Sequence, residues 1–449
     1  MKRFGLFLGD LISLYLALLV TLFIRYGSDF SVQLYFHLPA FSIIFIIWLI
    51  VFYINNLYDL SSAKNDIHFF SGLFYSLLVN ASISLLFFYF IPFFGITPKT
   101  NLFIFVGINL LLACVWRFYF NKLIAQSSFK NNTLIIGDGE QSRELYDFLL
   151  ANPQLGYHGV GIIDIEDRNA QGILQNLINQ KHIKTLILTH SVYKIPHIID
   201  VFYRLLGFEI NFFNLSNFYE RITGRVPLGA IDQIWFLENL SQGSQRGYEI
   251  GKRIGDIILS IIGIIISLPF YPFIILAIKL NSKGPIFIRQ HRVGKSGQQF
   301  YLIKFRTMIA NSPDGSAEGA SGPVWASEDD KRTTGVGKFI RRMRIDEWPQ
   351  FWNMLRGEMS FVGPRPERPE FHEKLQKEIP FYEERYLVKP GLTGWAQIKH
   401  KLDFRGGKTI KDTYEQLQHD LYYVKNRSLL LDFGIILRTI SILLKKALG

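Results

Sequence analysis

Two adjacent carboxylates, Asp346 and Glu347, stand among arginines and are the strongest candidates for chemistry in this chain. The segment reads Arg341-Arg-Met-Arg-Ile-Asp-Glu-Trp-Pro-Gln350 and is followed by Gly363-Pro-Arg-Pro-Glu-Arg-Pro369. A carboxylate can bind Mg²⁺ or attack phosphorus and form an acyl phosphate. Arginines stabilise charge on phosphoryl oxygens and favour the ionised form of Asp346. The pattern predicts a phosphoryl-transfer site, although spacing alone leaves open a solvated, charged helix start followed by a proline-rich turn.

Further cations lie on either side of this pair. Arg365 is bracketed by prolines, which restrict its backbone and hold it in place at low entropic cost. Lys304 and Arg306 alternate with apolar residues, so one face of a strand can present both to an anion. These residues are candidates for substrate binding, and a salt-bridged sheet surface is the alternative for Lys304 and Arg306.

The middle of the chain carries a weak nucleotide-binding pattern. Gly137-Asp-Gly-Glu-Gln-Ser142 follows a strand candidate at 133–136. The dinucleotide fingerprint has a third Gly or Ala where Ser142 stands, and an acid about 20 residues on, for which Asp164 is late. Further strand candidates at 160–164 and 185–188 alternate with helical segments, which predicts a parallel sheet. We expect a Rossmann-like domain without a cofactor, and NAD binding is the alternative.

The elements that must hold these residues begin with membrane segments. Hydrophobic residues make up 49% of the 449 residues. Four apolar stretches are each near the ~20 residues that a spanning helix needs: Phe4–Ile24, Leu38–Ile54, Phe69–Ile91 and Leu102–Phe120. A modest excess of Lys and Arg in the loops places the N-terminus in the cytoplasm, and four spans return the chain there.

A fifth apolar run, from Ile257 to Leu280, contains Ser267 and Pro269 at its centre. Proline inside a helix removes a hydrogen bond and kinks the chain. The residues leave two paths open, a single kinked span or a hairpin that enters and leaves the membrane by one face.

Charge narrows the choice of ligand. The net charge is +12, and residues 241–449, with 33 Lys and Arg against 21 Asp and Glu, account for the whole excess. A basic domain suits nucleic acid, an anionic bilayer or a diphosphate, and the membrane spans favour the last two. The single cysteine, Cys114, excludes an internal disulfide and a Cys-based zinc site.

Six strings in the C-terminal part carry a family resemblance. They are Lys252-Arg-Ile-Gly-Asp256, Gly284-Pro-Ile-Phe287, Lys304-Phe-Arg-Thr-Met308, Arg344-Ile-Asp-Glu-Trp-Pro-Gln350, the run from Asn353 to Pro369, and Lys389-Pro-Gly-Leu-Thr-Gly-Trp-Ala-Gln397. In this order they closely resemble the bacterial sugar transferases that start exopolysaccharide and O-antigen assembly, the monotopic polyprenyl-phosphate phosphoglycosyl transferases. The N-terminal part resembles the large members of that family by architecture.

The resemblance implies roles for the candidates. Asp346 would be the nucleophile that forms a phosphosugar-aspartyl enzyme, and Glu347 would assist as a metal ligand or base beside Mg²⁺. Arg341 and Arg365 match the family's phosphate-contacting arginines, and Lys304 falls in its basic strand. The apolar run would be a re-entrant hairpin over about 254–280, broken at Ser267 and Pro269. The intervening Leu268 departs from the family's Ser-Pro pair.

We therefore expect an α and α/β membrane protein with three parts. These are a transmembrane region (1–125), a Rossmann-like domain (126–245) without a cofactor, and a catalytic domain (246–449) at the cytoplasmic face of the bacterial inner membrane. Homodimerisation and regulation are both open as roles of the middle domain. The expected reaction transfers a hexose 1-phosphate from a UDP-sugar, with UDP-glucose or UDP-galactose as our choice, to undecaprenyl phosphate and releases UMP.

Two other functions remain to be weighed. An NAD-dependent nucleotide-sugar dehydratase or epimerase has only the Gly137 pattern in its favour, and no Tyr-x-x-x-Lys pair in a Rossmann context supports it. A non-enzymatic membrane scaffold is opposed by the intact Asp-Glu pair and its arginines.

Overall fold

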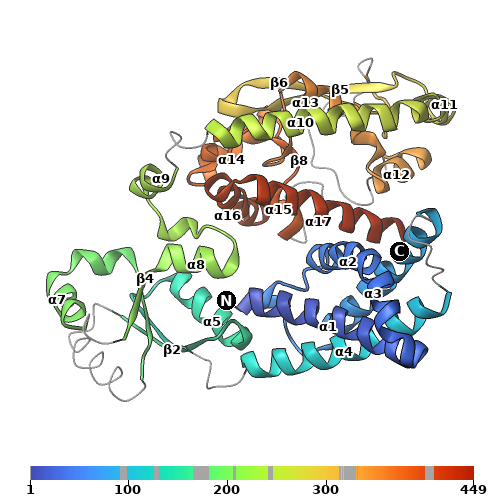
Figure 1. Ribbon diagram of the computed structural model, residues 1–449. Helices are drawn as coiled ribbons and strands as arrows, with labels where there is room; N and C mark the ends of the chain where they lie inside the picture. Colours follow the sequence, from blue (N-terminus) through green and yellow to red (C-terminus); the bar gives the residue numbers. More distant parts are fainter. Residues whose placement is uncertain are drawn as a thin grey trace. The chain divides into compact units, whose positions relative to one another are not determined.

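The computed structural model describes residues 2–91, 99–125, 131–164, 182–205, 209–240, 246–312, 315, 317, 330, 332–399 and 409–448. The chain forms two compact units, Met1–Leu215 and Ser216–Gly449. Figure 1 shows the elements of both in chain order.

Four long helices open the first unit, as the sequence predicts: α1 (Lys2–Tyr26), α2 (Phe30–Ile54), α3 (Ile67–Phe90) and α4 (Lys99–Ala125). Within the described residues, four helical stretches are long and apolar enough to cross a membrane. They are Lys2–Ile54, which holds both α1 and α2, then Ile67–Phe90, Thr100–Ile124 and Arg246–Asn281. The chain is accordingly a membrane protein.

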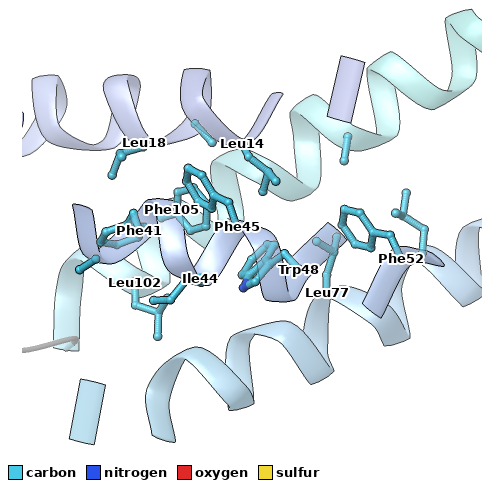
Figure 2. Packing of buried hydrophobic residues seen from close by; sticks show 14 of the residues in the cluster. Leu14, Leu18, Phe41, Ile44, Phe45, Trp48, Phe52, Leu77, Leu102 and Phe105 are labelled. Carbon is cyan, nitrogen blue, oxygen red and sulfur yellow. The ribbon is translucent and has the colours of Figure 1, made fainter. Parts of the chain in front are cut away.

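Aromatic rings fill the centre of this helical bundle. Phe41, Phe45, Trp48 and Phe105 are buried and contact one another at ring-centroid distances of 5.3–6.0 Å (Figure 2). Lipid offers no hydrophobic drive for helices to associate, so close packing of this kind must hold the bundle together.

A four-stranded parallel sheet follows, as expected from the alternating strands and helices. Its strands are β1 (Asn131–Ile136), β2 (Tyr157–Ile163), β3 (Thr185–Leu188) and β4 (Asn211–Asn214), with helices α5 (Glu140–Ala151) and α7 (Pro196–Leu205). The strand order is β2-β1-β3-β4, which is the flavodoxin-like doubly wound order rather than that of the dinucleotide-binding fold.

The turn between β1 and α5 holds an acidic side chain at the N-terminus of the helix. The Asp138 carboxylate accepts a hydrogen bond from the Gly139 amide at 2.8 Å and forms an ion pair with Arg143. A helix N-terminus is where a dinucleotide places its pyrophosphate. The Asp138–Arg143 pair stands at this position.

The second unit contains the candidate site. Its helices are α8 (Leu215–Thr223), α9 (Gln233–Asn239), α10 (Arg246–Ser267), α11 (Tyr271–Asn281), α12 (Gly335–Arg342), α13 (Gln350–Arg356), α14 (Pro369–Glu378), α15 (Trp395–Lys399), α16 (Ile410–Asn426) and α17 (Leu429–Leu448). Its strands are β5 (Phe287–Val293), paired antiparallel with β6 (Gln299–Phe305), and β7 (Ser360–Val362), paired in parallel with β8 (Gly391–Thr393).

The segment from α8 to α9, which we assigned to the middle domain, packs into this second unit. Val226, Leu228 and Trp235 share a buried cluster with residues of α14 and α16. The Val226 amide also donates to the Gln418 carbonyl at 3.0 Å. The compact unit thus begins about 30 residues before the expected boundary at 245/246.

The apolar run is broken where the sequence predicts a break. α10 ends at Ser267, a 3₁₀ turn covers Leu268–Phe270 and includes Pro269, and α11 follows. α10 packs against α13 and α11 packs against α12, so both halves of the broken helix contact the second unit (Figure 1). Their other faces leave large apolar side chains exposed, including Ile265, Phe273 and Leu280.

Candidate active site

A tight turn between α12 and α13 carries Asp346 and Glu347. The 3₁₀ turn Ile345–Glu347 begins after Arg344, whose φ of 58° is a left-handed conformation that is uncommon for a residue other than glycine. Both acidic residues are buried, with 8% and 5% of their surface exposed. Buried carboxylates need charged or hydrogen-bonding partners, so their surroundings decide what they can do.

The two carboxylates differ in the hydrogen bonds that they accept from the surrounding cations. Arg344 Nη1 donates to Glu347 Oε1 at 2.6 Å, and Arg365 Nη2 reaches the same oxygen at 3.4 Å. The Asp346 carboxylate makes no hydrogen bond to any residue within the described ranges. Glu347 is therefore held, whereas Asp346 keeps its oxygens available to a reactant.

A small recess opens beside Glu347. It is lined by Arg292, Leu302, Lys304, Glu347, Gln350, Arg365, Pro366 and Gly391. Three of these residues carry cationic side chains, so the lining suits an anionic group. Asp346 lies next to Glu347 but outside the residues that line it.

Lys304 reaches the site because the β5–β6 hairpin is fixed to α13. Asn353 Nδ2 donates to the Tyr301 carbonyl at 2.7 Å, and the Ile303 amide donates to Asn353 Oδ1 at 3.1 Å. Asn353 is fully buried and therefore clamps β6 directly before Lys304. The sequence analysis did not single out Asn353, whose role depends on which strand packs on α13.

Arg306 does not join the cluster, which corrects the expectation that it faces the substrate with Lys304. Its guanidinium is buried and donates to the Lys283 and Ser282 carbonyls at 2.6 and 2.7 Å. Alternation places residues 304 and 306 on one face only while the strand continues, and β6 ends at Phe305. Arg306 instead anchors the chain that leaves α11.

Arg365 stands on a loop that is fixed by close backbone contact. β7 pairs with β8, the Gly363 amide donates to the Thr393 carbonyl at 2.9 Å, and the Gly391 amide donates to the Pro364 carbonyl at 2.9 Å. A Cβ on Gly391 would lie 2.1 Å from the Gly363 nitrogen. Only glycine allows these two segments of the backbone to approach this closely.

Arg292 supports the same loop and faces the recess. Its Nη1 donates to the Pro366 carbonyl at 3.1 Å, and it forms an ion pair with Glu367 at 3.8 Å. Neither Arg292 nor Arg344 is among the cations that the sequence singles out. The number of charges was visible in the sequence, but the direction of each side chain was not.

Arg341 lies in the last turn of α12. Its Nη1 donates to Thr333 Oγ1 at 2.9 Å, and its charge is among those that lower the pKa of Asp346. The structure thus brings Arg341, Arg365 and Lys304 toward the Asp-Glu pair. Their role in substrate binding stays a prediction.

Burial and the neighbouring charges give the two carboxylates different pKa values. Burial, followed by the neighbouring charge of Glu347, raises the pKa of Asp346 to about 6. Burial alone would raise the pKa of Glu347 as well, but Arg344, Arg365 and Lys304 outweigh it and hold that pKa at about 2. Burial also lowers the pKa of Lys304 to about 7. Near neutral pH, Asp346 is therefore an ionised group of raised basicity next to a permanently charged neighbour.

Comparison with known proteins assigns a family to the region that contains the site. Residues 247–446 match the family model described as "Bacterial sugar transferase". UDP-glucose:undecaprenyl-phosphate glucose-1-phosphate transferase of Xanthomonas campestris pv. campestris is 30% identical over 350 residues, 72% of this chain and 68% of that protein. The chain belongs to the bacterial sugar transferase family.

Two further members of the family differ in the sugar that their names give. UDP-N-acetylgalactosamine-undecaprenyl-phosphate N-acetylgalactosaminephosphotransferase of Aeromonas hydrophila is 40% identical over 236 residues, 53% of each chain. Undecaprenyl-phosphate glucose phosphotransferase of Komagataeibacter xylinus is 28% identical over 363 residues, 78% of this chain and 66% of that protein. The match to the Aeromonas protein thus spans about half of that relative's length.

The part of the chain that matches the bacterial sugar transferase model contains every site residue described above, together with the break at Ser267 and Pro269. The break lies close to the acidic turn, because the ring of Phe270 contacts that of Trp348 at 6.1 Å between centroids. Trp348 directly follows Glu347, so the apolar break and the candidate nucleophile occupy one end of the unit.

The residues that could hold a metal are few. Among the described residues, no group of three or more His, Cys, Asp or Glu side chains gathers as a ready-made site. Mg²⁺ commonly binds through one or two carboxylates together with substrate phosphates. Asp346 and Glu347 fit that pattern only when a diphosphate is present, since the cations around them otherwise repel a divalent ion.

Proposed function

We propose that this bacterial sugar transferase moves a sugar 1-phosphate from a UDP-sugar to undecaprenyl phosphate, giving undecaprenyl-diphosphate-sugar and UMP. The observation that carries the proposal is the contrast between Asp346 and Glu347. Glu347 is bound by Arg344 and Arg365, while Asp346 is buried, has a raised pKa and accepts no hydrogen bond from any described residue. A nucleophile needs that availability.

The first step forms a bond between an Asp346 carboxylate oxygen and the sugar-linked phosphorus. The bond from that phosphorus to the oxygen of UMP breaks, and UMP leaves with the electron pair. In the second step, an oxygen of undecaprenyl phosphate attacks the same phosphorus, and the Asp346 carboxylate departs. Both steps conserve charge and regenerate the enzyme without a separate base.

The cations assist because charge builds up on the transferring phosphoryl group. Lys304, Arg365 and Arg292 line the recess, and Arg341 stands on the Asp346 side of the turn. Preorganised cations in a dry site stabilise such charge more than water does. Mg²⁺, held by Asp346, Glu347 and the donor diphosphate, would neutralise part of the negative charge on the phosphates.

The donor sugar is the finer part of the proposal. UDP-glucose and UDP-galactose remain our choice, and the similarity to the Aeromonas protein adds UDP-N-acetylgalactosamine to the sugars to be tested.

The proposed membrane placement puts the second unit in the cytoplasm of the bacterial inner membrane, with α10 and α11 as a re-entrant hairpin. Polar contacts support it on both sides of the break. Arg253 of α10 donates to the Met354 and Leu355 carbonyls of α13 at 2.7 Å each. After α11, the Ser282 and Lys283 carbonyls accept from Arg306, which follows the strand that Asn353 fixes to α13. A helix that crossed the bilayer would carry its two ends to opposite sides. Homodimerisation through the middle domain stays a prediction.

The test uses membranes that contain the full chain, Mg²⁺, undecaprenyl phosphate and a panel of UDP-sugars, with UMP release as the readout. Asp346→Asn keeps the shape of the side chain but removes its charge, and Asp147→Asn on the exposed surface of α5 is the matched control. We expect release with one sugar, abolished only by Asp346→Asn. Release that survives Asp346→Asn would overturn the covalent step, and no release with any sugar would overturn the reaction.

A further inference from the structure

A buried ion pair lies behind the loop that carries Arg365. Arg385, in the 3₁₀ turn Tyr382–Leu387, and Asp420, in the middle of α16, have side chains that are 1% and 2% exposed. Arg385 Nη2 lies 2.7 Å from Asp420 Oδ2. Such pairs add little to stability relative to apolar residues of the same volume, because both charges lose their water. Neither residue lines the recess, so their role there must be indirect.

The pair reaches the site through a main-chain contact. Arg385 Nη2 also donates to the Arg365 carbonyl at 3.0 Å, while its Nη1 donates to Tyr382 Oη at 2.6 Å. One guanidinium thus connects a helix, a turn and the loop. Its planar fork makes this possible, whereas the ammonium of lysine has no fixed arrangement of donors.

The loop needs such a contact because prolines stand on both sides of Arg365. Pro364 and Pro366 have no amide hydrogen, so they donate nothing to a backbone ladder. The carbonyls of residues 364 and 367 accept from backbone amides. The two carbonyls between them accept from side chains, Arg385 at residue 365 and Arg292 at residue 366. The Arg365 side chain is then presented to Glu347 and the recess.

Residues outside the family region pack near the pair. Val226, Leu228 and Trp235 share a buried cluster with Tyr382, which accepts a hydrogen bond from Arg385, and with Leu421, which follows Asp420 in the sequence. These three residues precede residue 247, where the match to the family model begins. Excluding water from the ion pair strengthens its attraction and keeps the guanidinium in one orientation.

We infer that Arg385, oriented by Asp420, is a positioning residue that holds the main chain of Arg365 and thereby aims its guanidinium at the transferring phosphate. The kinetic part of this inference rests on the proposed function, whereas the structural part does not.

The structural part is tested by hydrogen exchange on the purified full chain, followed in peptides that cover residues 360–372. Arg385→Lys keeps the charge but loses the fork. Glu220→Gln is the matched control, because it removes the charge from another ion pair that involves α16, in which Lys425 Nζ lies 2.7 Å from Glu220 Oε2 and the two side chains are 17% and 7% exposed. We expect faster exchange in 360–372 for Arg385→Lys, at least about tenfold for one lost charged hydrogen bond, and an unchanged rate for Glu220→Gln.

The kinetic part is tested by a double-mutant cycle in kcat/KM for UMP release with Arg365→Ala. If Arg385 acts through Arg365, Arg385→Lys lowers kcat/KM in the wild-type background and has no further effect when Arg365 is already alanine. A purely structural loss would instead multiply in both backgrounds, as we expect for any effect of Glu220→Gln.

Each outcome decides something different. Unchanged exchange in 360–372, or effects of Arg385→Lys and Arg365→Ala that multiply, would overturn the inference. Wild-type protein that releases no UMP would overturn the proposed function, while the exchange experiment would still decide whether Arg385 holds the loop. If Arg385→Lys does not fold, Asp420→Asn, which keeps an oxygen acceptor, is judged by the same two criteria.

Discussion

Arg344 lies 2.6 Å from Glu347 across the turn that carries Asp346, and it adopts a left-handed backbone conformation to do so. One arginine thus neutralises Glu347 and contributes positive charge beside Asp346. Backbone strain of this kind is found where the surrounding structure imposes a functional geometry. The arrangement links the local fold of the turn to the acidity of the proposed nucleophile.

This link predicts the pH dependence of the reaction. Asp346 has a raised pKa of about 6 and must be ionised to attack, so kcat/KM falls as the pH decreases through about 6. Arg344→Gln removes a cation that lowers this pKa, so the acid limb moves to higher pH, by up to about 1 unit. The pH profile of UMP release measures both. Arg342→Gln, an exposed change of equal charge, should leave the limb in place; equal shifts in both variants would contradict the assignment.

Arg306 and Lys304 should respond in opposite ways to substitution. Arg306→Lys loses the bidentate contact with the Ser282 and Lys283 carbonyls, so we expect a stability loss of about 2–3 kcal/mol with little change in KM. Lys304→Met removes a half-buried cation from the recess, so we expect kcat/KM to fall at least about tenfold without a loss of stability. Thermal unfolding and UMP kinetics separate the two. A raised KM with normal stability for Arg306→Lys would return that residue to the substrate site.

Gly391→Ala should disrupt the loop of Arg365. The added methyl group would lie 2.1 Å from the Gly363 nitrogen, which is backbone and cannot rotate away. Overpacking of this kind costs about 1–3 kcal/mol or more, and the displaced loop should also abolish UMP release. Gly335→Ala, in α12, meets no atom within 4 Å and serves as the control. An active Gly391→Ala protein of normal stability would show that the β7–β8 contact does not position Arg365.

The re-entrant placement predicts equal access at the two ends of the broken helix. In a Cys114→Ser background, Arg246→Cys and Lys283→Cys place single exposed thiols at the start of α10 and after α11. Both should react with a membrane-impermeant maleimide in inside-out vesicles, and neither should react in intact cells. Labelling of the two positions from opposite sides would instead show one kinked span, and would place the site in the periplasm.

Local sequence predicts much of the secondary structure of this protein. The four N-terminal helices, the parallel sheet after residue 131 and the break at Ser267 and Pro269 each lie where apolar runs, alternation or proline predict them. Asp346 and Glu347 are adjacent in the chain, so their proximity needs no folding. The short strand β4 was missed because its four residues, Asn211–Asn214, give too little alternation to detect.

Tertiary structure decided which charges serve the site. The end of β6 at Phe305 sends Lys304 to the recess and Arg306 to the end of α11, although the two look equivalent in the sequence. Asn353 clamps a strand about 50 residues away, and the Arg385–Asp420 pair joins positions 35 apart to the loop of Arg365. Local spacing determines an element and its faces, but partners this distant meet only through the path of the whole chain.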